Sequence, residues 1–219
     1  MPSSREQAHS IAALRNFPSP WRGGVRGGVN AGAEDCNLLD RMLRPVSIRR
    51  YLDVERHAQL GRDLDAIFFE ASTRKSFADG AERSAFRERW LGRYLRDDPG
   101  FAYLAMSTTD ELVGYLVGSV DDPLSRKFAD IGYFAMFREL TVHCPAHLHV
   151  NVRSDCRGFG IGARLIDAFA EDARRAGAPG VHVVTSAASD NVRFYQRNGF
   201  AEAGRSGEGE LVFLARKLP

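Results

Sequence analysis

Residues 157–162, with the sequence RGFGIG, stand between a strand-like segment and an amphipathic helix pattern. A glycine-rich turn at the start of a helix leaves backbone N–H groups without intrahelical partners, at the positive end of the helix dipole. Groups arranged in this way form a binding site for phosphate. The turn therefore predicts a strand, a phosphate-binding loop and a helix in direct succession.

The segments on either side of the turn support this prediction. Before it, Leu148, Val150 and Val152 alternate with His147, His149 and Asn151, which predicts a strand with one apolar and one polar face. After it, apolar residues follow the helical period until Gly177 and Pro179 end the helix. These apolar positions are Ile161, Leu165, Ile166, Phe169, Ala170 and Ala173.

The chain from Met42 onward has the pattern of one mixed α/β domain without an internal repeat. Asp53 is expected to cap one helix, and Asp79 with Glu82 forms a start resembling a capping box for a second. The apolar positions of these two helices are Leu60, Leu64, Ile67, Phe68 and Ala71, then Phe86, Trp90, Leu91, Tyr94 and Leu95. Further strands are expected at 46–51, 101–106, 112–120, 181–184 and 210–214, and a short helix at 190–198. Segment 124–146 is rich in aromatic residues but irregular, and either packs in the core or covers a substrate.

Composition limits the classes of partner. The net charge is only +2, so no general electrostatic attraction to nucleic acid is expected, and no apolar run has the length of a membrane span. Three cysteines, Cys36, Cys144 and Cys156, fit a reducing, cytoplasmic setting better than a disulfide framework. Oligomeric state stays open, with a homodimer as one candidate.

Residues 1–41 differ from the domain at 42–219. The segment around 18–29 is rich in glycine, arginine and proline, and it offers little apolar surface against the entropy of ordering. We expect a disordered N-terminal extension. Two alternatives are an arginine–glycine arm that stacks nucleic acid on Trp21, and translation that begins at Met42.

Three classes of phosphate ligand are compatible with a glycine turn. A P-loop requires Lys followed by Ser or Thr after the last glycine, and Ala163 and Arg164 stand there instead. A dinucleotide fingerprint fits Gly158, Gly160 and Ala163 only loosely, because the turn lies late in the chain and position 183 is Val rather than an acidic residue. The third class, acyl-CoA, accounts for more of the sequence.

Arg157, Gly160 and Gly162 match the motif R/Q-x-x-G-x-G/A, and residues 194–200 read FYQRNGF downstream. This pair of motifs resembles the GNAT N-acetyltransferase superfamily over about residues 45–216. The resemblance implies an α/β fold with a mixed, mostly antiparallel sheet flanked by helices and splayed at the acyl-CoA slot, between the strands around Val150 and Val183.

A closer resemblance is to a subgroup related to the acetyltransferase-like domain found with O-GlcNAc hydrolases. Its members carry a Pro-Ala/Ser-His-Leu-His-Ile-like strand, which residues 145–150 (PAHLHV) match. The chain has no room for a glycoside hydrolase domain, so the resemblance brings no hydrolase activity with it.

The resemblance implies acetyl-CoA as co-substrate, and an enzyme that moves its acetyl group to an amine. Its diphosphate would bind the backbone amides of Arg157, Gly158, Phe159, Gly160, Ile161 and Gly162. The pantetheine arm would pair with the exposed backbone of Val150, Asn151 and Val152 like an added strand, and Asn191 could hold a pantetheine amide. Asn191 stands four residues before Tyr195, where many relatives have seven.

Three residues are the candidates for proton transfer. Tyr195 is placed by the family pattern to protonate the departing CoA thiolate, and a backbone N–H near Val150 or Val152 would stabilise the oxyanion. His149 is the first candidate for the base and His147 the second, because an imidazole titrates near neutral pH. Asn151 cannot act as a base where related sequences often have Asp.

Other roles for these residues remain open. The His-x-His spacing of His147 and His149 could suggest a metal, but no third ligand is evident and we predict none. Cys156 is interpreted as a small residue under the turn rather than an acyl carrier. The acceptor is a small-molecule or peptide amine, and the alternative function is a sensor that binds acyl-CoA without transferring the acyl group.

Overall fold

The computed structural model describes residues 45–55 and 58–219, in which seven strands form one sheet with the order β1-β2-β3-β4-β5-β7-β6. Neighbouring strands are antiparallel except for β4 and β5, which are parallel. The strands are β1 (Ser47–Arg50), β2 (Ala102–Met106), β3 (Leu112–Ser119), β4 (Ala146–Val152), β5 (Gly180–Ser186), β6 (Ala201–Arg205) and β7 (Leu211–Lys217). The predicted mixed, mostly antiparallel α/β fold is confirmed. The extension predicted at 1–41 lies outside the described residues.

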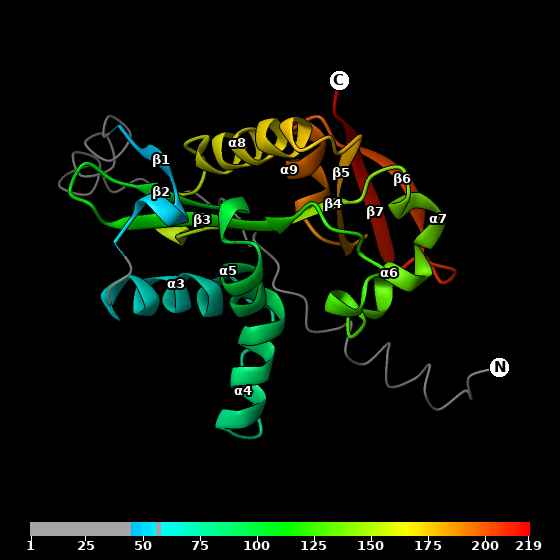
Figure 1. The fold of residues 1–219 in the computed structure, drawn as a ribbon. Coiled ribbons are helices and arrows are strands. Elements are labelled where there is room, and N and C mark those ends of the chain that lie inside the picture. The colour runs from blue at the N-terminus through cyan, green and yellow to red at the C-terminus, as the bar shows by residue number, and fades with distance from the viewer. Residues whose placement is uncertain (1–44, 56–57) are drawn as a thin grey trace, which may run out of the picture.

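Helices cover both faces of the sheet (Figure 1). Helix α8 lies along one face, and α3, α5 and α6 lie on the other. The helices of the described residues are α3 (Ala58–Ala71), α4 (Gly80–Arg87), α5 (Arg93–Asp97), α6 (Gly132–Met136), α7 (Arg138–Thr141), α8 (Ile161–Arg175) and α9 (Asn191–Arg197). A π-helical segment, η2 (Glu88–Gly92), joins α4 to α5, and single 3-10 turns are η1 (Tyr51–Asp53), η3 (Pro99–Phe101), η4 (Arg126–Phe128) and η5 (Ser154–Cys156).

The helix signals in the sequence are confirmed with one exception. The apolar positions expected for α3 are all buried, and so are those of α8. Asp79 caps α4 by accepting a hydrogen bond from the Glu82 amide at 2.8 Å, and the Glu82 carboxylate accepts from the Ala78 amide at 2.7 Å. Asp53 does not cap α3, because it ends the separate turn η1.

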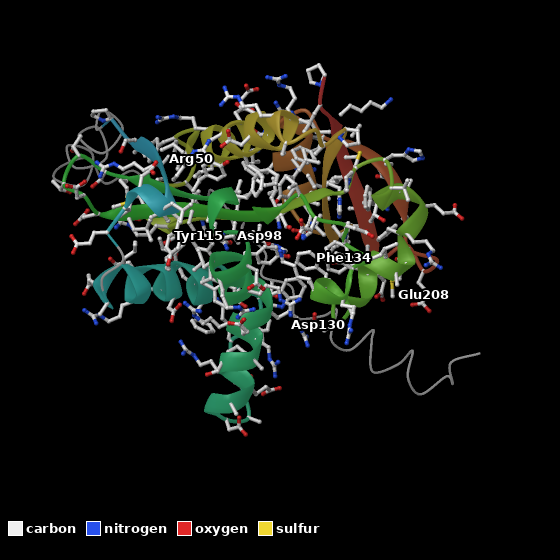
Figure 2. The ribbon with its side chains drawn as sticks, in the orientation of Figure 1. Arg50, Asp98, Tyr115, Asp130, Phe134 and Glu208 are labelled. Atoms are coloured by element: carbon white, nitrogen blue, oxygen red, sulfur yellow. The ribbon has the colours of Figure 1, made fainter. Side chains whose placement is uncertain are left out.

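Segment 124–146 packs into the core beneath the sheet. Its aromatic residues Phe128, Tyr133, Phe134 and Phe137 are buried, whereas Met136 faces solvent. Asp130 in this segment pairs with Arg93 at 2.7 Å and with Arg89 at 2.8 Å, which joins the segment to η2 and α5 (Figure 2). Of the two alternatives for this segment, the structure therefore favours packing in the core.

Strand β6 was not predicted. Its residues, AEAGR, are mostly exposed and carry no apolar alternation, and alanine, glutamate and glycine have low strand propensity. The strand forms because its backbone pairs with β7 along the edge of the sheet. A strand held by its partner's hydrogen bonds leaves little trace in its own sequence.

The face of β4 that the sequence marks as polar is not a solvent-exposed face. His147 and Asn151 are each only 2% exposed, and His149 is half-buried. Helices α3 and α5 and the aromatic segment lie on this face of the sheet, so the alternation separates two buried layers rather than core from water.

Candidate active site

The site begins where β4 and β5 part. The two parallel strands are paired only at Ala146 with Val181 and His147 with His182, and no register continues beyond them. From His149 onward the two strands diverge, which leaves a slot in the middle of the sheet. The predicted splay is confirmed.

The backbone of β4 turns polar groups into this slot. The Arg153 amide donates to the Val113 carbonyl at 2.9 Å, and the β3–β4 register pairs Tyr115 with Asn151 and Leu116 with Val150. In an antiparallel ladder only alternate residues point their N–H and C=O toward the partner strand. Residues 151 and 153 therefore face β3, and Val150 and Val152 direct their backbone groups toward the slot.

The turn that follows β4 takes the conformation that its glycines allow. Gly158 and Gly160 have φ angles of 87° and 74°, and Gly160 caps α8 without a side-chain hydrogen bond. The first N–H groups of α8 thus remain available to a ligand. A Cβ on Gly162 would stand 2.9 Å from the Phe194 ring, so this glycine lets α9 approach the start of α8.

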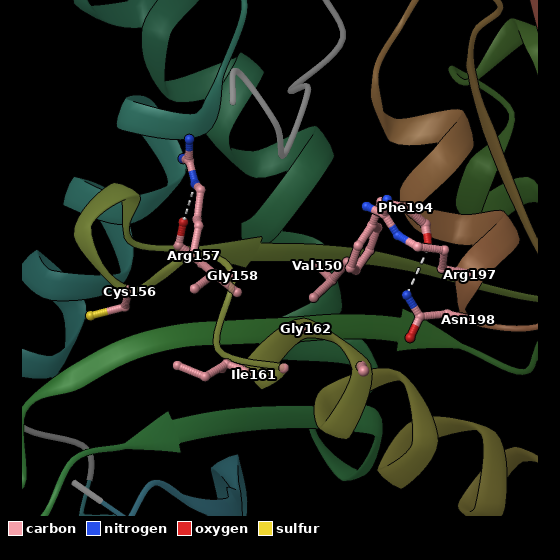
Figure 3. A pocket seen from close by; sticks show the side chains of 12 residues that line it. Val150, Cys156, Arg157, Gly158, Ile161, Gly162, Phe194, Arg197 and Asn198 are labelled. Atoms are coloured by element: carbon pink, nitrogen blue, oxygen red, sulfur yellow. Dashed lines mark hydrogen bonds between the residues drawn. The ribbon is translucent and has the colours of Figure 1, made fainter. Parts of the chain in front are cut away.

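A cavity of about 380 Å³ lies between β4, the turn and α9 (Figure 3). Seven of the predicted cofactor-binding residues line it: Val150, Val152, Arg157, Gly158, Gly160, Ile161 and Gly162. Three predicted residues, Asn151, Phe159 and Asn191, are not part of its lining. The structure adds Cys156, Ala163, Phe194, Arg197 and Asn198.

Arg197 and Asn198 line the cavity and stand inside the FYQRNGF motif, but the sequence did not predict them as site residues. Asn198 donates its side-chain amide to the Phe194 carbonyl at 2.7 Å and so closes the end of α9 (Figure 3). Arg197 is exposed at the cavity and is the positive charge that α9 brings to it. The only signal in the sequence was proximity to Phe194 and Tyr195.

The Arg157 guanidinium is already engaged. Its Nε donates to the Val152 carbonyl at 2.9 Å, and its Nη2 lies 3.9 Å from the Glu70 carboxylate. In Figure 3 the side chain extends away from Ile161 and Gly162. The backbone amides of the turn, rather than this side chain, are therefore the groups in place for a diphosphate.

The two predicted histidine bases have different surroundings. The ring of His147 packs against Phe128 and Phe134 at centroid distances of 4.6 and 4.8 Å, and its Nε2 has no hydrogen-bond partner among the described residues. His149 is half-buried, and its Nε2 lies 3.3 Å from the Tyr94 hydroxyl. Burial lowers the pKa of His149 to about 3 and that of His147 well below its usual value, so both are neutral at pH 7.

Tyr195 is buried on α9, between Phe194 and Phe200 at ring distances of 5.1 and 5.4 Å. Burial raises its pKa above the usual value, so the hydroxyl keeps its proton and can donate it. Burial also raises the pKa of Tyr133, and the Tyr94 and Tyr195 hydroxyls add to that rise.

Other candidates occupy structural positions. Asn151 donates its amide to the Tyr115 hydroxyl at 2.7 Å, and Asn191 is buried in the first turn of α9. Cys156 is buried, and burial raises the pKa of its thiol, which disfavours an acyl-carrier thiolate.

Within residues 45–55 and 58–219, no three His, Cys, Asp or Glu side chains stand together as a metal site would require. No helix there is long and apolar enough to cross a membrane.

Comparison with known proteins gave consistent matches. Residues 62–200 match the acetyltransferase (GNAT) family. The structure titled SsHAT matches with a TM-score of 0.62 at 20% identity, over 80% of this chain and 98% of that one. The NatC complex bound to Gag peptide and CoA gives a TM-score of 0.54 at 16% identity over 80% and 99% of the two chains. An agmatine N-acetyltransferase mutant in its apo form gives 0.54 at 15% identity over 79% and 99%.

Proposed function

The chain belongs to the GNAT acetyltransferase family, and on that premise we propose that it transfers an acetyl group from acetyl-CoA to an amine. The observation that carries the proposal is the slot beside Val150 and Val152, which ends at the glycine turn and the start of α8. A diphosphate at the turn and an amide-rich arm along the strand need this combination of backbone groups.

The turn would hold the diphosphate of acetyl-CoA. Gly158, Gly160 and Gly162 allow the backbone to come close to the phosphates, and the dipole of α8 favours their charge. Arg197 would add a positive side chain from α9. The pantetheine arm would extend β4 along the edge of Val150 and Val152, where the Val152 carbonyl already accepts a hydrogen bond from Arg157.

The amine attacks the thioester carbon, the carbonyl oxygen takes up negative charge, and the C–S bond breaks to release CoA. The Val150 N–H would stabilise the oxyanion, and the Tyr195 hydroxyl would hydrogen-bond or protonate the leaving sulfur. His149 would accept the proton from the amine, directly or through water, rather than His147, which Phe128 and Phe134 enclose. A histidine with a pKa of about 3 is a weak base, so entry of water with the acceptor would be needed to raise it.

The acceptor would be a small-molecule or peptide amine. The matched structures include one titled with a bound peptide and one titled as acting on agmatine, and both kinds of amine fit the reaction. The subgroup resemblance of residues 145–150 stays a prediction, to be tested by the acceptor that the protein selects.

The test is release of free CoA thiol from acetyl-CoA in the presence of a panel of amines and peptides. Tyr195→Phe is expected to lower kcat by roughly 100-fold or more, the usual contribution of a general acid, with the KM for acetyl-CoA within about twofold. Tyr103→Phe is the matched control, because it removes a hydroxyl that bonds Asp172 at 2.5 Å, and it should leave kcat unchanged. Equal effects of the two variants would remove Tyr195 from the mechanism.

A second function, acyl-CoA binding without transfer, is favoured by one observation. None of the three predicted catalytic residues belongs to the cavity lining, and His147 and Tyr195 are only 2% and 4% exposed. A sensor would bind acetyl-CoA tightly and release no CoA thiol with any amine in the panel. Turnover with one amine would exclude it.

A further inference from the structure

Glu70 is the last acidic residue of α3, and its carboxylate contacts residues 154–157 at the start of the glycine turn, the segment called the cofactor turn below. Its Oε1 accepts a hydrogen bond from the Ser154 amide at 3.0 Å and lies 3.9 Å from the Arg157 Nη2. Lys75 holds the end of α3 from the other side, because its ammonium donates to the carbonyls of Phe69 and Glu70 at 3.1 and 2.7 Å. Glu70 therefore anchors the turn to the end of α3, and Lys75 in turn fixes that end of the helix.

The contact crosses between the two layers of the fold. Helix α3 packs against β3 and β4 on the face opposite α8, while the turn leads from β4 into α8 (Figure 1). Ser154 is the first residue of the short turn η5, and Arg157 directly follows its last residue. A single carboxylate thus connects the α3 layer to the loop that precedes the phosphate site.

The same carboxylate lies near the Arg157 guanidinium, which points away from the start of α8 (Figure 3). Arg157 donates to the Val152 carbonyl at 2.9 Å, and its side chain is only 13% exposed. The Val152 carbonyl is one of the groups that β4 directs into the slot, so Arg157 covers an acceptor that an amide ligand would use (Figure 3).

We propose that Glu70 is a positioning residue for the cofactor turn, with two effects of opposite sign on binding of CoA. Its hydrogen bond to the Ser154 amide orders the turn and favours binding. Its negative charge keeps Arg157 on the Val152 carbonyl and repels the diphosphate, and so weakens binding. The proposal rests on the proposed function, because it takes the ligand of the turn to be the diphosphate of CoA.

Two substitutions separate the effects. Glu70→Gln keeps an oxygen for the Ser154 amide but removes the charge, and it is expected to tighten CoA binding about threefold at low salt. Glu70→Ala removes both, and it should bind about fivefold more weakly than Glu70→Gln, the usual effect of one hydrogen bond. A residue with only a structural role would weaken binding in both variants.

The measurement is calorimetric titration of the full-length protein with CoA at low and high salt. The gain in Glu70→Gln should shrink toward unity at about 0.5 M salt, where charges a few ångströms apart are screened. It should become smaller but not vanish when Arg157→Gln is added, because the direct repulsion between Glu70 and the diphosphate then remains. Glu208→Gln, at an exposed site in the turn between β6 and β7, is the matched control and should leave the Kd for CoA unchanged. Exchange of the Ser154 amide with deuterium, followed by NMR without ligand, should accelerate in Glu70→Ala only.

The outcomes distinguish the two proposals. If the wild type binds CoA and Glu70→Gln binds equally tightly or more weakly, the positioning role is wrong and the proposed function stands. If the wild type binds no CoA at any salt concentration, both proposals are wrong.

Discussion

The two sides of β4 are built by different means. The edge that faces the slot presents backbone groups of Val150 and Val152 and continues into glycines, and the neighbouring cavity stays open. The face that carries His147 and His149 is closed by aromatic side chains from η2, α5 and the segment at 124–146. One side is made by local chain geometry and the other by residues far away in the sequence.

Because the two sides of β4 are built differently, they should respond to different conditions. Backbone amides at a helix start bind phosphate without any titrating group, so the slot should depend on turn geometry and salt rather than on pH. The closed face contains three neutral histidines, the buried His147 and His182 and the half-buried His149, and it should depend on pH and packing. Substitutions on each side of β4 test that division.

The largest effect is expected from opening the closed face. Phe134 is 1% exposed and its ring lies 4.8 Å from that of His147, so Phe134→Ala should lower the free energy of unfolding by about 3–5 kcal/mol. Met136→Ala, on the same helix but 46% exposed, should change it by less than about 0.5 kcal/mol. Urea denaturation measures both, and similar small values would favour a lid rather than a core segment.

Acid should weaken the same face. Burial lowers the pKa of His182 to about 4, below its value near 6.5 in the unfolded chain, so the unfolded state binds the proton first as pH falls. Stability is then fully present above pH 6.5 and is lost as pH falls toward 4, by about 2 kcal/mol at pH 5 from this residue alone.

Urea denaturation at pH 7.5 and pH 5 measures this loss. His182 donates its Nδ1 proton to the Cys144 carbonyl at 2.5 Å, and His182→Asn keeps a donor at that place without the titration. The variant should lose less stability than the wild type between the two pH values. An identical loss in both proteins would assign the acid sensitivity to other groups.

The slot should respond to turn geometry. Gly160 has a φ angle of 74°, which a β-branched residue adopts at a cost of about 1–2 kcal/mol, so Gly160→Val should weaken CoA binding about tenfold. Gly209, with a φ angle of 72° in the turn between β6 and β7, provides the matched control. Gly209→Val carries a similar backbone strain, and it should lower stability without changing the Kd for CoA.

The smallest effect is expected from charge at the cavity. Arg197 lines the cavity and is exposed, so Arg197→Gln should weaken CoA binding by about two- to threefold at low salt, as screened surface charges do. Arg193→Gln, exposed on the same helix but outside the cavity lining, should have a smaller effect. Titration at two salt concentrations compares them, and equal effects would mean that only the overall charge matters.

Much of the fold could be predicted because its signals are local. The alternation in β4, the period of α8 and the capping residues of α4 each fall within one element, and each is confirmed. The edge strand β6 could not be predicted in this way, because β7 holds it through backbone bonds. The prediction that Asp53 caps α3 was wrong for a different reason. A short-range pattern does not determine where a separate turn ends and the next helix begins.

The sequence alone determined the glycine turn and the start of α8, because a glycine with positive φ and a helix start are properties of a few consecutive residues. Only the tertiary structure decided what surrounds them. It closed the histidine face with aromatic rings from distant segments, placed Glu70 of α3 against the Ser154 amide, and directed the Arg157 side chain to the Val152 carbonyl. Burial and pairing depend on the whole packed molecule, and they set the charge and freedom of each of these side chains.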